Sequence, residues 1–198
     1  MRYAFLVETY ATERVKVLSV WSEFQDSVLT TRPRQGDPRG RSVVEQMVHQ
    51  CVSEDLWFRT MLGIDVEAPP LPGAETRMEF IRRYAADSGK RLAALESKDD
   101  AWWESETSFF EVRRSRAWVM VRRIAHTSHH RGQLMAMLRM LGTDVHSNYG
   151  PTADTGGLMA NRAPTIYAYG SLEELLAEGE KARLPGAGGK AVTERPDH

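Results

Sequence analysis

Two histidines, His126 and His130, stand four residues apart in the segment 124–134. A helix turns by about 100° per residue, so positions i and i+4 lie one above the other on the same face. Two imidazoles placed in this way are able to share one metal ion. Val119 and Met137 project within about 20° of His126, which indicates an apolar stripe around the pair instead of an open charged face.

Zinc proteases use the same helical spacing in the pattern His-Glu-x-x-His, where the glutamate is the general base. Thr127 occupies the glutamate position here. The sequence therefore argues against a metalloprotease.

A third histidine, His49, lies in a segment that we expect to be helical from residue 42 to residue 62. Ser42 and Glu45 form a capping-box pattern at its start, and Gly63 is a natural stop. A lone histidine on an apolar face is more often a satisfied core residue than a ligand. Three imidazoles buried without a metal would demand many polar partners, which favours a metal site for the set. Such a site would keep an open position for water or substrate.

The overall composition indicates one domain over residues 1–183, followed by a glycine-rich and charged tail over 184–198 that we expect to be disordered. The chain has 198 residues and a net charge of −1, so there is no general electrostatic case for binding nucleic acid or a membrane.

The single cysteine, Cys51, excludes an intrachain disulfide and fits a reducing compartment. No segment has the apolar length of a membrane span. We therefore expect a cytoplasmic protein.

Apolar residues recur at helical spacing in four long segments, and Pro- and Gly-rich loops separate the first three. We expect helices over about 4–29, 42–62, 74–97 and 112–141, with a short fifth helix over 171–183. The stretch 98–103 breaks the third pattern, and its Trp102 and Trp103 are expected to be packing residues. The prediction is an all-α four-helix bundle with a short extra C-terminal helix.

A second apolar stripe runs along the fourth predicted helix, roughly 100° or more from the histidine pair. It contains Met120, Ile124, Met135 and Leu138. A helix that is apolar on two sides needs a second partner, and another subunit would supply one.

Two motifs resemble those of a known family. Ile-Ala-His-x-x-x-His-Arg-Gly-Gln-Leu at 124–134 resembles the last-helix signature of the DinB/YfiT-like superfamily, and the spacing of His49, Glu54 and Trp57 resembles its second-helix pattern. The resemblance covers about 15–142. It implies an up-down-down-up bundle that holds a divalent metal, often zinc or nickel, on His49, His126 and His130. Many members are homodimers, which would explain the second stripe.

The resemblance also suggests a reaction, because the better understood members are similar to enzymes that transfer or isomerise through a low-molecular-weight thiol such as bacillithiol or mycothiol. A thiol bound to a metal ion loses its proton near neutral pH. Arg123 and Arg131 are candidates for holding carboxylates of such a cofactor. For Arg122 we expect a solvated or rim position instead.

Two other functions stay open at this point. The first is a small-molecule hydrolase with a metal-bound water, for which only Glu54 or His129 is at hand as a base. The second is a non-catalytic dimer with a structural or sensing metal. His129 and His146 depart from the family pattern. Each would be a fourth ligand, a proton carrier or a solvated side chain, and we favour the last.

Overall fold

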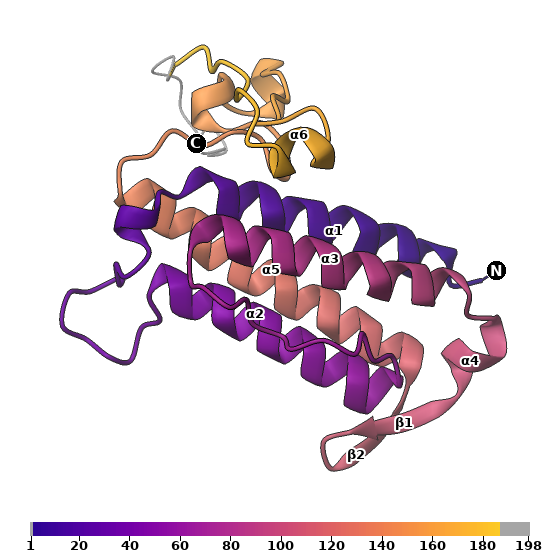
Figure 1. The fold of residues 1–198 in the computed structure, drawn as a ribbon. Helices are drawn as coiled ribbons and strands as arrows, with labels where there is room; N and C mark the ends of the chain where they lie inside the picture. Colours follow the sequence, from indigo (N-terminus) through magenta and orange to yellow (C-terminus); the bar gives the residue numbers. More distant parts are fainter. Residues whose placement is uncertain (1, 187–198) are drawn as a thin grey trace, which may run out of the picture.

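The protein is described by a computed structural model, which places residues 2–186. Four long helices lie side by side, and a small two-stranded sheet projects from one end (Figure 1). The long helices are α1 (Ala4–Glu23), α2 (Val43–Trp57), α3 (Arg77–Glu96) and α5 (Arg116–Met140). The shorter elements are η1 (Asp26–Val28), η2 (Phe58–Leu62), α4 (Asp100–Glu104), β1 (Glu106–Phe109), β2 (Val112–Ser115), η3 (Ala153–Thr155), η4 (Met159–Asn161) and α6 (Leu172–Leu176). The predicted mostly helical fold is confirmed.

Local sequence signals set the ends of α2, which carries the first histidine. Ser42 Oγ accepts from the Glu45 backbone N–H at 3.3 Å, and Glu45 Oε2 accepts from the Ser42 N–H at 2.8 Å. This is the predicted capping box. The π-helical turn η2 extends the helix to Leu62, and Gly63 follows at φ 69°, a left-handed conformation that suits glycine.

Two clusters of buried side chains form the core. One surrounds Trp21 and includes Cys51, which is 3% exposed, and the other surrounds Phe58 and Trp103. The wall-packing role predicted for Trp103 is therefore confirmed. The second apolar stripe of α5 packs largely within its own chain, because Met120 and Leu138 are buried in these clusters and Ile124 and Met135 are partly buried against them. The second subunit expected from the stripe stays a prediction.

A buried carboxylate, Glu54 of α2, joins all four long helices. Its oxygens accept hydrogen bonds from the hydroxyls of Tyr10 on α1, at 2.7 Å, and Tyr84 on α3, at 2.8 Å. The guanidinium groups of Arg91 and Arg123 lie 3.4 Å and 3.9 Å from it. A buried charge with this many partners is stabilised in place, so Glu54 acts as a polar centre of the packing.

The hairpin of β1 and β2 is the largest departure from the predicted elements. Residues 112–115, predicted as the start of the last helix, pair as a strand with β1, and Val112 faces Phe109. Ser115 then caps α5 by accepting from the Trp118 N–H. Phe109 packs against Trp57 with ring centroids 5.2 Å apart, which fixes the hairpin on η2 and the end of α2.

Two other predicted helices were too long. The first ends at Glu23 because Phe24 is extended, with ψ at 156°. The last ends at Leu176, since Glu178 adopts a positive φ of 53°.

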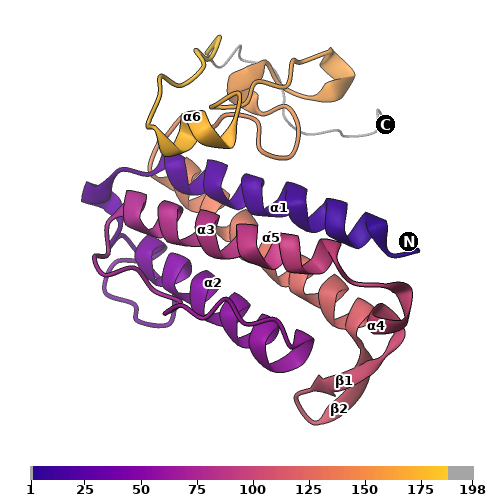
Figure 2. The same cartoon turned by 45° about the vertical axis from the view of Figure 1, so that its right-hand side comes forward.

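The segment that follows α5 folds back over α1, on the side away from α2 (Figure 2). His146 lies near the start of this segment and contacts both α1 and the later part of the segment. Its Nδ1 lies 2.9 Å from Oε1 of Glu23 on α1, and its Nε2 lies 2.6 Å from the Ala182 carbonyl oxygen. Of the predicted tail, all but residues 184–186 lies outside the described residues. Between residues 2 and 186, no helix combines the length and the apolar character that a membrane span requires.

Candidate metal centre

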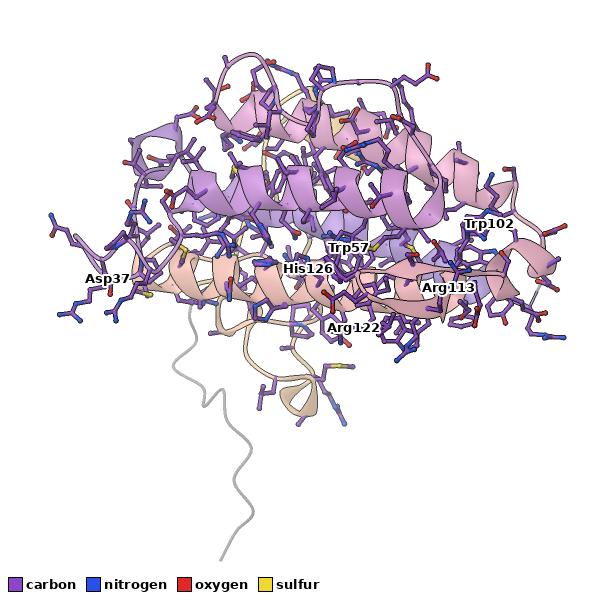
Figure 3. All side chains as sticks on the ribbon, turned by 90° about the horizontal axis from the view of Figure 1, so that it is seen from below. Asp37, Trp57, Trp102, Arg113, Arg122 and His126 are labelled. Carbon is purple, nitrogen blue, oxygen red and sulfur yellow. The ribbon has the colours of Figure 1, made fainter. Side chains whose placement is uncertain are left out.

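Three histidines meet where α2 packs against α5. His49 comes from α2, and His126 and His130 come from successive turns of α5. His126 Nε2 lies 3.4 Å from His49 Nε2 and 3.3 Å from His130 Nε2. His126 lies between the two helices, close to Trp57 (Figure 3). The residues that the sequence nominated as a ligand set are therefore brought together.

Two of the three nitrogen separations fit a shared metal ion, and the three ligand atoms all lie within 4.8 Å of one another. Two imidazole nitrogens bound at about 2.0–2.1 Å in tetrahedral geometry would lie about 3.3–3.4 Å apart. The distances of 3.4 Å and 3.3 Å fall in that range. No other group of three or more metal-ligating side chains gathers in this way in residues 2–186. A three-ligand set leaves room for a fourth, exchangeable ligand.

A hydrogen bond at the far side of the ring orients His130. Its Nδ1 lies 2.8 Å from Gln46 Oε1, so Nδ1 carries the proton and Nε2 presents its lone pair to the centre. Gln46 in turn donates to Gln133 Oε1 at 2.8 Å, which fixes the amide. For His126 the far nitrogen is buried and has no partner among the described residues.

The electrostatic environment keeps the imidazoles uncharged. Burial, and then the positive charge of Arg123, lowers the pKa of His126 to about 3. Burial and the neighbouring histidines lower the pKa of His130 to about 4. Burial and Arg41 also lower the pKa of His49. Neutral imidazole is the form that binds metal ions, so all three are ready to ligate at neutral pH.

The comparisons with known proteins give the family of the chain. A model of the DinB family matches residues 5–157. The chain belongs to the DinB family. No curated protein matches the sequence.

Solved structures of DinB-like proteins share the fold. One from Bacillus cereus ATCC 10987 has a TM-score of 0.62 and 17% identity, over 71% of this chain and 93% of that chain. Another, YjoA from Bacillus subtilis, has a TM-score of 0.57 and 17% identity, over 70% of this chain and 92% of that chain. At this identity the likeness concerns the fold.

An aromatic wall borders the histidines of this DinB chain on one side. The Trp57 ring lies 5.5 Å from the His126 ring and 6.2 Å from that of Phe110, centroid to centroid. Phe109 packs between Trp57 and Trp118. The sequence patterns did not predict this wall, because Phe109 and Phe110 approach the centre only through the hairpin. Its one signal was the Phe-Phe pair placed just before α5.

The two arginines predicted to bind a cofactor are engaged inside the protein. Arg123 donates to Ser53 at 3.0 Å and to Gln50 at 2.9 Å, and its guanidinium is buried. Arg131 donates to Glu13 at 2.8 Å on the α1 side of the helix. Their cofactor role stays a prediction, while these contacts favour packing roles.

Arg41 lies beside the histidines although no sequence motif indicated it. It is exposed, immediately precedes the cap of α2, and makes no hydrogen bond or ion pair among residues 2–186. It lines a cavity of about 300 Å³ together with Gln46 and Gln133, the two amides beside His130. Its charge is close enough to lower the pKa of both His49 and His130.

The remaining candidate residues lie outside the ligand set. His129 is exposed and accepts from Gln133 at 3.0 Å. The solvated position expected for His146 was wrong, since it is 6% exposed and holds the C-terminal segment. Arg122 is exposed, as expected. Thr127 is buried and accepts from Arg123, so it supplies no base.

Proposed function

We propose that this DinB-family protein binds one divalent metal ion, zinc or nickel, through His49, His126 and His130, within an up-down-down-up four-helix bundle. We further propose that it is an enzyme of the thiol S-transferase or isomerase kind acting on a small electrophile. The observation that carries the proposal is the convergence of three neutral imidazoles. His126 Nε2 lies 3.4 Å from His49 Nε2 and 3.3 Å from His130 Nε2. The family membership supports it.

A divalent ion held here would lower the pKa of a coordinated thiol, so that the thiolate forms near neutral pH. The residues around the centre have complementary roles in the proposal. Arg41 binds an anionic group of the thiol cofactor, because it is exposed and its charge is close enough to lower the pKa of both His49 and His130. Trp57 and Phe110 pack against the apolar part of the electrophile.

The two alternatives have less support. A hydrolase needs a base beside a bound water, and Glu54 is fully buried with two tyrosine hydroxyls on its oxygens. His129 is the remaining candidate, with its ring 4.9 Å from that of His130. A structural or sensing site is favoured by a closed shell of four protein ligands, whereas the group in residues 2–186 has three.

We also propose that the protein is a homodimer, whose interface lies beside the histidine centre and not on the second apolar stripe of α5. Four apolar side chains of α2 and α5 near the centre are exposed by 37–50%: Val52, Leu56, Trp118 and Val121. A second copy of the chain would cover them.

Metal analysis of the purified protein tests the first part of the proposal. We expect about one equivalent of divalent metal in the unmodified protein, and its loss in His49→Ala and in His126→Ala, because two imidazoles bind far more weakly than three. His129→Ala is the matched control, since it removes an adjacent histidine outside the ligand set. Retention of metal by both ligand variants, or loss in the control, would contradict the site.

The metal-loaded protein is then tested for the reaction. Bacillithiol, mycothiol, glutathione and coenzyme A are each incubated with a panel of small electrophiles. We expect turnover with at least one thiol, and its loss in His126→Ala. Metal binding without thiol binding or turnover would remove the enzymatic part of the proposal and leave the metal site intact.

A further inference from the structure

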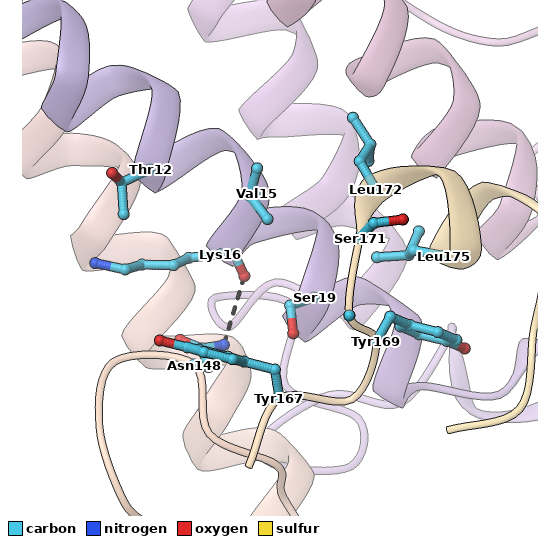
Figure 4. A pocket seen from close by; sticks show the side chains of 11 residues that line it. Thr12, Val15, Lys16, Ser19, Asn148, Tyr167, Tyr169, Ser171, Leu172 and Leu175 are labelled. Carbon is cyan, nitrogen blue, oxygen red and sulfur yellow. Dashed lines mark hydrogen bonds between the residues drawn. The ribbon is translucent and has the colours of Figure 1, made fainter. Parts of the chain in front are cut away.

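A second cavity lies between α1 and the C-terminal segment (Figure 4). This segment covers α1 on the side away from α2 (Figure 1). Its volume is about 350 Å³, at the lower end of the usual range of about 300–1,000 Å³ for small-molecule sites. Val15, Leu172 and Leu175 contribute apolar surface, and Tyr167 and Tyr169 contribute aromatic rings. The cavity is therefore suited to a small ligand with an apolar body.

One end of the cavity is polar and carries excess positive charge. Lys16, whose stem lines the cavity, has its amine 3.0 Å from Glu13 Oε1. Arg131 Nη2 lies 2.8 Å from the other oxygen of the same carboxylate. Two cations thus share one anion, which leaves a net charge of about +1 at this end. Glu174 does not line the cavity, and its Oε2 accepts at 2.8 Å from the N–H of Gly170, which does.

Asn148 fixes the polar end in place. Its Oδ1 accepts from Arg131 Nη1 at 2.7 Å, and its Nδ2 donates to the Lys16 carbonyl oxygen at 3.4 Å, the bond drawn in Figure 4. Asn148 itself lines the cavity. The wall that carries the charge is therefore held by α5 and by the C-terminal segment together.

The C-terminal wall lies beyond the part of the chain that matches the family. The DinB match ends at residue 157, whereas the apolar and aromatic walls at Tyr167, Tyr169, Leu172 and Leu175 come after it. On the α1 side, Val15 is 40% exposed although it is apolar, so the cavity has an apolar wall that no side chain of the described residues fully covers.

We propose that this cavity binds a small organic carboxylate, with the apolar body between Val15, Leu172 and Tyr167 and the carboxylate toward Lys16. Such a site is separate from the histidine centre and does not depend on a metal. The ligand class follows from the volume, the apolar walls and the single excess positive charge.

The test uses 4-phenylbutyrate and its uncharged amide, 4-phenylbutyramide, as a matched pair in calorimetric titration of the full-length protein. We expect one binding site per chain and about fivefold tighter binding of the acid, the effect of one partly screened charge pair. Lys16→Met keeps the stem and removes the charge, so it should abolish the difference between acid and amide. Lys98→Met, on a lysine outside the cavity, is the control.

Two further variants, Val15→Trp in the cavity and His126→Ala in the histidine centre, test where the compounds bind. Val15→Trp fills the cavity from a half-exposed position and should weaken both compounds at least about tenfold, with the circular dichroism spectrum unchanged. His126→Ala should bind 4-phenylbutyrate as well as the unmodified protein, because the histidine centre is not involved. Equal binding of acid and amide, tighter binding of 4-phenylbutylamine, or unchanged binding in Val15→Trp would each overturn the proposal.

Discussion

At the scale of single residues, His130 Nδ1 has two amide acceptors, Gln46 Oε1 at 2.8 Å and Gln133 Oε1 at 3.2 Å, and the shorter bond to Gln46 contributes most to the choice of the nitrogen that faces the centre. Without an acceptor at Nδ1, the imidazole would populate both tautomers and would rotate more freely. Gln46 lies one turn before His49, so α2 supplies both a ligand and the residue that orients a second ligand.

Replacing this amide should weaken metal binding. For Gln46→Leu we expect about 10–100-fold lower affinity for zinc, the usual effect of losing a partner that orients a ligand. Gln46→Glu keeps an acceptor and should restore most of the affinity. Competition with a chromophoric chelator measures both variants, and Gln35→Leu on the exposed loop serves as the control. An unchanged affinity in Gln46→Leu would show that the tautomer is fixed by other contacts.

The ligand histidines were predictable from the sequence, but the arginines were not. His126 and His130 share a helix face by their spacing alone, His49 lies on a second helix with a clear start signal, and the resemblance of the second-helix motif supports it as the third ligand. Helical periodicity predicts the side of the helix on which a residue lies, but it does not predict which part of the protein packs against that side. Arg123 and Arg131 were therefore predicted as cofactor ligands, although the structure shows that each donates hydrogen bonds to side chains of neighbouring helices. Arg41 was missed because a loop positions it.

At the scale of elements, the capping box of α2 holds the start of the helix that carries Gln46 and His49. Ser42 is itself buried, and its backbone and side chain both take part in the box. The first turn of α2 would fray without these bonds, since the N–H groups of a helix start have no partners within the helix.

Removing the cap should lower stability more than metal affinity. For Ser42→Ala we expect a loss of about 1 kcal/mol in the free energy of unfolding, measured by urea denaturation of the metal-free protein. Zinc affinity should change by less than the loss seen for Gln46→Leu, because the cap lies a full turn from the amide. Ser27→Ala, at an exposed position, should change neither quantity. A Ser42→Ala variant as stable as the parent would be inconsistent with the box.

The elements that the sequence predicted well are those with a start signal and a long repeat, such as α2 and α5. The hairpin was missed because four-residue strands give too little periodicity to distinguish them from a helix end. Val112 to Ser115 adopt the extended form because Phe109 packs on Trp57, a contact between residues 52 positions apart in the chain. Tertiary packing of this kind overrides local preference.

At the scale of the whole molecule, the exposed apolar side chains of α2 and α5 determine the expected assembly. We expect a dimer by size-exclusion chromatography with light scattering, and a monomer in the double variant Leu56→Glu with Val121→Glu, because a buried unpaired charge in the interface is costly. Met159→Glu, on an apolar residue that is exposed on the C-terminal segment, is the control. A monomeric parent protein, or a double variant that is still a dimer, would show that these side chains do not form a dimer interface.

The burial of Cys51 has a consequence for studying thiol chemistry with this protein. Burial raises the pKa of its thiol well above the ordinary value, and the side chain is 3% exposed. For a thiol the reactive nucleophile is the thiolate, so the folded chain has no reactive thiol of its own in residues 2–186. Alkylating agents should leave its intact mass unchanged, and every thioether product in a reaction mixture can then be traced to the added small thiol.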